Sequence, residues 1–167
     1  AVTGTNGKTT TTELLRCLVA ACGHEVILAG NNSIPFSTAV MVEPAPPFIV
    51  LEISSYQLEL IRTFRPWIAT VLNVTPDHLA RHGTIEGYAA AKARIFENQV
   101  QGDFAVVNLD DPYTRAMAPP ADATIWNYSL NEKVERGLWL VAFCSIEMAG
   151  DKPSIRSTSG FSMRCKN

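Results

Sequence analysis

The sequence predicts an α/β domain of the phosphate-loop (P-loop) type, in which a mostly parallel sheet has helices on both faces. Two observations carry this prediction. Short runs such as residues 48–51 and 104–108 are apolar throughout, which is typical of parallel strands buried on both faces. Segments with apolar residues at helical spacing alternate with these runs, as in chains of β-α-β units. Polar clusters follow the runs, at the strand ends where such folds bind ligands.

The first predicted element is a phosphate-binding loop. Residues 3–10 read TGTNGKTT, and glycines let backbone N–H groups approach an anion closely. Lys8 can reach the outer phosphates of a nucleotide, and the Thr9 hydroxyl can ligate Mg²⁺. The standard pattern has a glycine where this chain has Val2, so the loop is a variant. The predicted nucleotide-binding residues are Gly4, Thr5, Asn6, Gly7, Lys8, Thr9 and Thr10.

The helix after this loop extends to about residue 22 and opens on four threonines. Because β-branched residues are poor helix formers, such an opening is expected where a ligand binds. The alternative is an ordinary Gly/Asn turn ahead of a helix. Only three residues precede the Gly4 of the loop, although loops of this kind follow a strand. We therefore expect the chain to be a piece of a longer protein.

The remaining elements continue the alternation of strands and helices. Residues 84–87 resemble a helix-capping box with Gly87 in place of the usual glutamate. From Trp126 onward the pattern indicates a small antiparallel β region. We expect residues 1–125 to form the nucleotide-binding core and residues 126–167 a β-rich, truncated continuation of the same domain. The predicted elements are strands at 25–29, 48–51, 67–74, 104–108, 138–146 and 154–163 and helices at 54–61 and 84–98.

The composition limits the class of protein. Of 167 residues, 47% are apolar and 18% are charged, and the formal net charge is −2. These values are typical of a globular domain with a real core. The lack of a Lys/Arg run argues against nucleic acid or a membrane surface as a partner, and no apolar run approaches the roughly 20 residues that span a bilayer. The four cysteines have no zinc-site spacing, which favours reduced thiols in a cytoplasmic protein.

Charged side chains follow two of the predicted strands. Glu52 ends the strand 48–51, where nucleotide-binding sheets place a carboxylate for Mg²⁺; a solvated glutamate is the alternative. Asp77 and His78 follow the strand 67–74 and offer a carboxylate and an imidazole at the same sheet edge. A lone histidine is as often structural as functional, so both interpretations of His78 stay open.

Lys92 lies within the predicted helix 84–98, with Tyr88 and Phe96 one turn away on either side. Aromatic neighbours would shelter its amine and lower its pKa. Spacing alone nevertheless favours an ordinary lysine with a buried stem and a solvated head.

Five segments, in this order, resemble the Mur ligases of peptidoglycan synthesis. They are TGTNGKTT at residues 3–10, LEISSYQLE at 51–59, NVTPDHLARH at 73–82, YAAAKARIFEN at 88–98 and NLDD at 108–111. Residues 54–59 are most similar to the family members that add D-glutamate. The resemblance implies an ATP-dependent bacterial ligase that joins D-glutamate to UDP-N-acetylmuramoyl-L-alanine through an acyl phosphate. It also implies that this chain is the middle of three domains, so N- and C-terminal flanking domains are expected.

The resemblance further implies a role for each matching residue. Lys8 would contact the β- and γ-phosphates of ATP, and Thr9 with Glu52 would hold one Mg²⁺. His78 would hold or support a second Mg²⁺ together with Lys92, which the family carries as a carbamate. This modification turns a cation into the anionic oxygen ligand that Mg²⁺ prefers. The implied catalytic residues are Lys8, His78 and Lys92, and the implied contacts of the muramoyl substrate are Asn31, Ser54, Gln57 and His78.

The sequence departs from the family pattern at two positions. Ala80 stands where the family typically has an aspartate, which affects the support of His78. Ser33 stands where the family often has a glycine, which affects the shape of the loop that would contact the sugar substrate. Two other functions stay open. One is an isolated nucleotide-binding module without ligase activity, and the other is a related ligase similar to folylpolyglutamate synthase. Residues 54–59 argue against the second.

Overall fold

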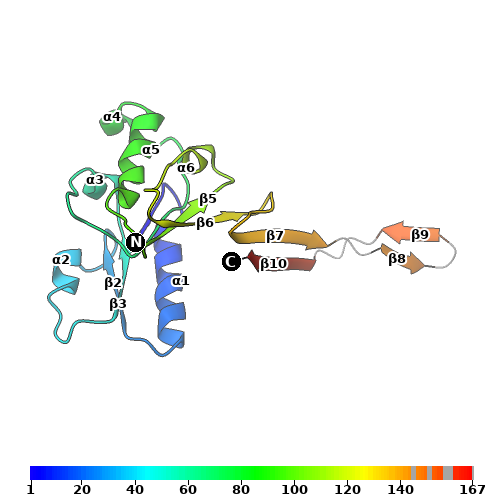
Figure 1. The fold of residues 1–167 in the computed structure, drawn as a ribbon, viewed down its shortest axis with the longest axis horizontal. Helices are drawn as coiled ribbons and strands as arrows, with labels where there is room; N and C mark the ends of the chain where they lie inside the picture. The colour runs from blue at the N-terminus through cyan, green and yellow to red at the C-terminus, as the bar shows by residue number, and fades with distance from the viewer. Residues whose placement is uncertain (144–145, 150–151, 156–159, 167) are drawn as a thin grey trace.

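An eight-stranded sheet organises the chain (Figure 1). This computed structural model describes residues 1–143, 146–149, 152–155 and 160–166, with side chains through residue 139. The strands are β1 (Val2–Thr3), β2 (Val26–Gly30), β3 (Phe48–Glu52), β4 (Ile68–Val71), β5 (Phe104–Asn108), β6 (Thr124–Ser129), β7 (Gly137–Phe143), β8 (Ile146–Ala149), β9 (Lys152–Ile155) and β10 (Gly160–Lys166).

The strand order is β10-β7-β6-β5-β4-β1-β3-β2. Every pair of neighbours from β7 to β2 is parallel, which confirms the predicted α/β fold with a mostly parallel sheet. At the other end β10 pairs antiparallel with β7, and β8 pairs antiparallel with β9 outside the main sheet. Residues 124–129 continue the parallel sheet, so the sheet extends across residue 125.

Helices lie on both faces of the sheet (Figure 1). They are α1 (Lys8–Ala21), α2 (Phe36–Ala39), α3 (Ser55–Leu58), α4 (Leu79–His82), α5 (Ile85–Ala93), the 3-10 helix η1 (Arg94–Phe96) and α6 (Pro112–Arg115). Among the described residues, no helix is long and apolar enough to cross a membrane.

One face of the sheet carries the main core, and we call it the closed face. There, α2, α3, α5 and η1 pack on strands β2 to β5, and side chains such as Leu58, Tyr88 and Ile95 contact small strand residues such as Ala69 and Ala105. Small residues on the strands let the helices approach the sheet closely. The closed face therefore holds α3 and α5 firmly above the carboxyl ends of β3 and β1.

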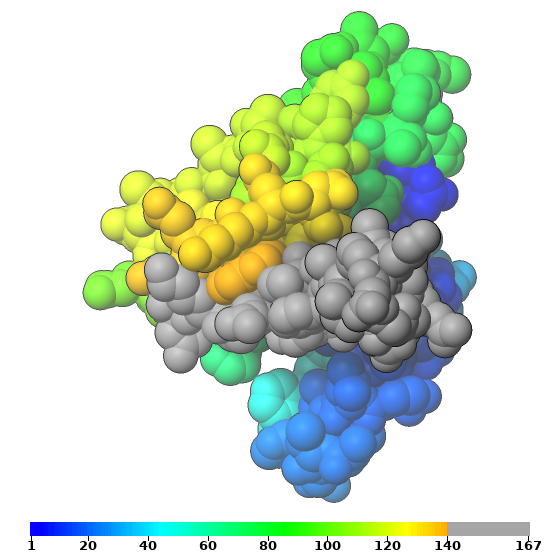
Figure 2. Space-filling view, turned by 90° about the vertical axis from the view of Figure 1, so that its right-hand side faces the viewer, coloured from blue at the N-terminus to red at the C-terminus, as the bar shows by residue number. Residues whose placement is uncertain are grey.

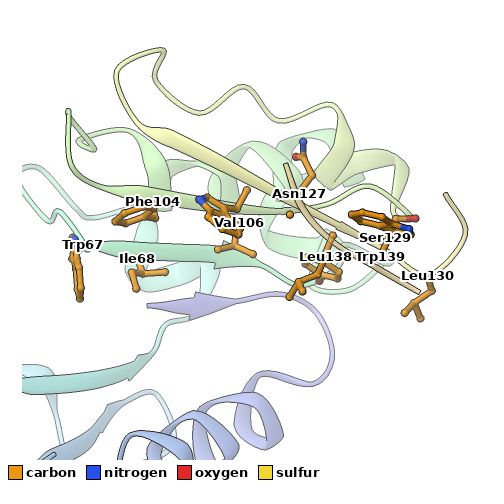
Figure 3. Close-up of a pocket in the computed structure, with 12 residues that line it drawn as sticks. Trp67, Ile68, Phe104, Val106, Asn127, Ser129, Leu130, Leu138 and Trp139 are labelled. Atoms are coloured by element: carbon orange, nitrogen blue, oxygen red, sulfur yellow. The ribbon is translucent and has the colours of Figure 1, made fainter. Parts of the chain in front are cut away.

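On the opposite face, which we call the half-covered face, α1 packs over β1 to β3, and it is the one helix there among the described residues. Figure 2 views the molecule from the right-hand side of Figure 1. In this view the segment of residues 124–139 lies between the α4–α5 region above and α1 below. Beyond α1, apolar side chains of β4 to β7 line a hollow on this face (Figure 3). They include Ile68, Phe104, Val106, Trp126 and Leu138.

Most predicted elements are present with shorter bounds, and the predicted cap of α5 is confirmed because Thr84 Oγ1 accepts from Gly87 N at 3.0 Å. Two strand predictions need correction. The run 138–146 contains all of β7 except Gly137 and the first residue of β8, and the run 154–163 contains parts of β9 and β10. The strands are divided because the chain leaves the main sheet after Phe143 to form the β8–β9 pair. Residues 144–145 and 156–159 lie outside the described residues. Helices α2, α4 and α6 were not predicted, since four residues are too few to show helical periodicity.

Candidate functional site

The predicted phosphate loop connects β1 to the first turn of α1. Gly7 is the N-cap of α1 with φ 81° and ψ 0°, a left-handed conformation that favours glycine. Gly4 has φ +153°, and a Cβ placed there would lie 3.0 Å from Leu72 Cβ. None of the described side chains caps α1, so backbone N–H groups of its first turn remain available for an anion at the positive end of the helix dipole.

The loop is fastened to the segment that follows β4. Asn73 accepts from Asn6 N through Oδ1 at 2.9 Å and donates from Nδ2 to Asn6 O at 3.1 Å. Thr5 Oγ1 donates to Thr75 O at 3.2 Å, and Thr75 N donates back to it at 3.0 Å. This reciprocal pairing fixes the loop against residues 73–75. Sequence analysis placed residues 73–75 at a strand end but assigned them no role, and their asparagine and threonine were the available signal.

Two lysines, 84 residues apart, meet at one carbonyl group of the loop. Lys8 Nζ donates to Gly4 O at 3.0 Å and to Thr5 O at 2.9 Å, and Lys92 Nζ donates to the same Gly4 O at 2.8 Å. Two ammonium groups on one acceptor leave a concentration of positive charge that a bound anion would offset. The tertiary structure therefore brings both predicted catalytic lysines to the phosphate loop.

Lys92 is buried, with 1% of its surface exposed. The expectation of a solvated head, based on spacing alone, is therefore wrong, because packing of α5 against the loop encloses the whole side chain. Its Nζ lies 4.3 Å from the centre of the Tyr88 ring. Burial, and then the charge of Lys8, lower the pKa of Lys92 to about 7, so near neutral pH much of this amine is uncharged and nucleophilic.

Glu52 lies at the end of β3 and faces the start of α1. Thr9 Oγ1 donates to Glu52 Oε2 at 2.8 Å, and Asn31 Nδ2 donates to Glu52 Oε1 at 3.2 Å. Asn32 Nδ2 also donates to Thr9 Oγ1 at 3.0 Å. Glu52 is only 3% exposed, which contradicts the alternative of a solvated glutamate. The predicted metal pair Thr9 and Glu52 is thus in direct contact.

Gly30 makes this arrangement possible, although sequence analysis assigned it no role. It has φ +107°, and a Cβ added there would lie 2.0 Å from Glu52 O. A glycine that ends a strand beside two asparagines was the only sequence signal for this close approach.

The predicted substrate residues Ser54 and Gln57 lie on α3, directly after Glu52. They form a capping box: Ser54 Oγ accepts from Gln57 N at 3.3 Å, and Gln57 Oε1 accepts from Ser54 N at 2.9 Å. Gln57 is exposed and Ser54 is half-buried near the strand ends, whereas Asn31 is engaged with Glu52.

His78 precedes α4 in a left-handed conformation with φ 51°. Asp77 Oδ1 accepts from His78 N at 2.8 Å, and Asp77 Oδ2 lies 3.5 Å from His78 Nε2. The ring centre of His78 is 5.1 Å from that of Tyr56 and 6.0 Å from that of Tyr88. Asp77 and two aromatic rings therefore support this histidine beside Ala80.

Of the four predicted metal residues, only Glu52 and His78 are His, Cys, Asp or Glu. Accordingly, within the described part of the chain no group of three or more His, Cys, Asp or Glu side chains could hold a metal ion. The Thr9–Glu52 pair still presents hydroxyl and carboxylate oxygens, the donors that Mg²⁺ prefers.

Comparison with known proteins places the chain in a family. The family model for the Mur ligase middle domain matches residues 2–164. The UDP-N-acetylmuramoylalanine–D-glutamate ligase of Thermoanaerobacter sp. (strain X514) is 46% identical over 140 residues, and its counterpart in Pelotomaculum thermopropionicum is 45% identical over 140 residues. Each match covers 84% of this chain and 31% of the relative. The chain thus spans about a third of the length of the curated relatives it matches.

Solved structures of similar fold belong to the same family. A UDP-N-acetylmuramoyl-L-alanyl-D-glutamate–2,6-diaminopimelate ligase has a TM-score of 0.67 at 29% identity, covering 97% of this chain and 37% of that one. The MurF ligase of Thermotoga maritima, in complex with ADP, has a TM-score of 0.68 at 26% identity, covering 87% of this chain and 35% of that one. From the family model, the curated relatives and these structures together, we conclude that the chain belongs to the Mur ligase family and corresponds to its middle domain.

Proposed function

We propose that the complete protein containing this chain is an ATP-dependent ligase that joins D-glutamate to UDP-N-acetylmuramoyl-L-alanine through an acyl phosphate. The names of the two curated relatives support this substrate pair, and the MurF structure in complex with ADP supports a nucleotide site in this part of the protein. The observation that carries the nucleotide-binding part is the convergence of Lys8 and Lys92 on Gly4 O.

Lys8 is the main phosphate ligand in this proposal. Its amine now donates to two carbonyl oxygens of the loop, and the β- and γ-phosphates of ATP would replace these acceptors with charged oxygens. Hydrogen bonds to ionised acceptors are roughly twice as strong as those to neutral ones. The attack of a substrate carboxylate on the γ-phosphate brings two anions together, so a fixed cation here stabilises the transition state more than the ground state.

Thr9 and Glu52 are the residues that would hold one Mg²⁺, since their oxygens are already in contact and the carboxylate is buried. A second ion would lie near His78 and Lys92. The ions, when bound, would offset the charge that develops on the transferred phosphoryl group. Asn31 would keep the Glu52 carboxylate oriented, because it already donates to its second oxygen.

Carbamylation of Lys92 fits the environment of this side chain. The reaction needs an uncharged amine, and the pKa of Lys92 is lowered to about 7 by burial and by Lys8. The product would be an anion beside the Lys8 cation, which removes the repulsion between the two amines. The half-buried N-cap Ser54 and the exposed Gln57 of α3 would bind the muramoyl end of the substrate together with His78. D-Glutamate would then attack the acyl phosphate, and phosphate would leave.

A second candidate is a nucleotide-binding module that ligates nothing by itself. This chain matches 31% of the length of relatives named as ligases. The two candidates agree on ATP binding and differ on ligation. Ligation by this chain mixed with separately produced flanking domains would contradict the second candidate.

The experiment that tests the shared part is a calorimetric titration of this chain with Mg-ATP. We expect binding by the parent chain and its loss in Lys8→Ala, a reduction of at least about a hundredfold for one phosphate-binding charge. The control is Arg16→Ala, which removes an exposed cation from the same helix. Binding that survives in Lys8→Ala, or its absence from the folded parent chain, would contradict the proposal.

A further inference from the structure

His82 is a buried residue for which the ligase chemistry described above has no role. It ends α4, and its side chain is only 2% exposed. Its Nδ1 lies 3.1 Å from Glu59 Oε1, and its Nε2 lies 3.1 Å from Ser55 Oγ. Both ring nitrogens are therefore engaged, and both partners belong to α3 or to its C-cap, one helical turn apart.

The chemistry of these partners determines which ring nitrogen carries the proton. The second oxygen of Glu59, Oε2, accepts two hydrogen bonds from Arg81, at 3.0 Å and 2.6 Å. Arg81 lowers the pKa of the Glu59 carboxyl, so the group is ionised at neutral pH and can only accept hydrogen bonds. His82 must then carry a proton on Nδ1. In neutral His82, Nε2 accepts from the hydroxyl of Ser55.

The order Ser55, His82, Glu59 resembles the hydrogen-bond order of a hydrolytic triad, but burial excludes that chemistry. Ser55 is only 3% exposed, so a substrate carbonyl has no access to its oxygen. The same burial keeps His82 from acting as a general base on a bound ligand. These hydrogen bonds therefore connect parts of the protein to each other.

Aromatic stacking extends the connection from α3 to α5. The His82 ring stacks on the ring of Tyr56, with ring centres 5.7 Å apart and planes at 19°. The centre of the His82 ring also lies 5.0 Å from that of Tyr88, which belongs to α5. Tyr88 in turn lies under Lys92 Nζ and against His78. His82 thus contacts both the helix that carries Ser54 and Gln57 and the tyrosine that contacts the two inferred metal residues.

We propose that His82 is a positioning residue of the ligase site, which fixes α3 against α5 so that the muramoyl-binding residues Ser54 and Gln57 stand in register with His78 and Lys92. This inference rests on the proposed function. It concerns the sugar side of the site, because the phosphate loop is held separately by Asn73 and Thr75. Loss of His82 should therefore affect the two substrates unequally.

The first test is the protonation state of His82 in this chain, measured by ¹⁵N NMR of the histidine rings. The chain has three histidines, so the His82→Gln spectrum assigns the signal. In the neutral ring we expect Nδ1 to carry the proton and Nε2 to be the acceptor. A neutral ring protonated on Nε2 would overturn the arrangement.

The second test uses the full-length protein and compares His82→Phe, which keeps a stacking ring, with His82→Gln, which keeps a donor and an acceptor. We expect His82→Phe to raise KM for UDP-N-acetylmuramoyl-L-alanine about tenfold, the effect of leaving buried partners without hydrogen bonds. KM for ATP should change less than about twofold, and His82→Gln should recover part of the loss. His24→Phe is the control, because His24 contacts Phe48 at the opposite end of the strands.

Equal changes in both KM values, or no change in either, would overturn the positioning role. A parent protein that binds Mg-ATP but does not ligate would instead contradict the proposed function, and with it the catalytic part of this inference. The tautomer measurement judges the Ser55–His82–Glu59 arrangement in either case, so the two failures are distinguishable.

Discussion

The two faces of the sheet have the same kind of strand but different surroundings. On the closed face, Val107 of β5 is 5% exposed beneath the helices. Its neighbour Val106 points to the half-covered face, into the hollow that all three tryptophans of the chain line (Figure 3). There Trp67, Ile68 and Leu138 are 56%, 44% and 42% exposed.

The difference bears on stability more than on the site. Asn73 and Thr75 fasten the phosphate loop to the segment after β4, and α5 on the closed face brings Lys92 to Gly4 O. On the half-covered face, apolar side chains of β4 to β7 contribute less, because the free energy of burial scales with the apolar area removed from water. Stability therefore depends mainly on the closed face, whereas the candidate site takes Lys8 and Thr9 from α1 on one face and Lys92 from α5 on the other.

The largest expected contrast compares two isoleucines. Ile95→Ala on the closed face, where the side chain is 0% exposed, should cost about 3 kcal/mol in free energy of unfolding, because it leaves a cavity. Ile68→Ala on the half-covered face, where the side chain is 44% exposed, should cost about 1 kcal/mol or less. Urea denaturation of both variants measures the difference. Similar losses would show that the half-covered face is packed as tightly as the closed one.

A second contrast concerns the buried charge of Lys92. Its pKa in the folded protein is about 7, against an ordinary value of 10.5. Between pH 7 and pH 10.5 the unfolded chain binds one proton more than the folded chain, so the free energy of unfolding rises with pH across this range. Below pH 7 the amine is protonated in both states, and the full cost of burying the cation lowers the stability. Lys92→Met should stabilise the chain at pH 7 by roughly 2 kcal/mol and remove much of that rise.

Denaturation curves from pH 6 to pH 10 in CO₂-free buffer measure this effect, since carbamylation would otherwise alter the charge. Lys133→Met is the matched control, because Lys133 is exposed. If the parent chain and Lys92→Met give parallel curves, the amine is not held in a closed environment.

The smallest contrast uses adjacent residues of one strand. Val107→Ala should cost about 1.5 kcal/mol, and Val106→Ala about 0.5 kcal/mol, because only the first removes fully buried methyl groups. Both substitutions change β propensity equally on the same strand, so the difference reports the covering of each face. Chemical denaturation again gives the measurement, and a reversed order would mean that the hollow is the better packed side.

Much of the fold and of the loop could be predicted from the sequence, because local patterns encode them. Continuous apolar runs indicated the parallel strands, and the residues TGTNGKTT indicated the phosphate loop before α1. Lys92 shows the limit of such patterns. Its spacing favoured a solvated head, and only the contact of α5 with Gly4 O revealed a buried amine. The nucleotide, metal and substrate roles themselves remain predictions.

His82 and Gly30 show the same limit more strongly. His82 has no pattern in the sequence that distinguishes it from a surface histidine, and Gly30 has only its place at a strand end beside two asparagines. Their importance arises from partners far along the chain, Ser55 for His82 and Glu52 for Gly30. Residues that are close together in the sequence determine where strands, helices and loops form. Which side chains meet at the sheet edge, and which face is closed, depends on how those elements pack, because burial and hydrogen-bond geometry exist only once distant segments are in contact.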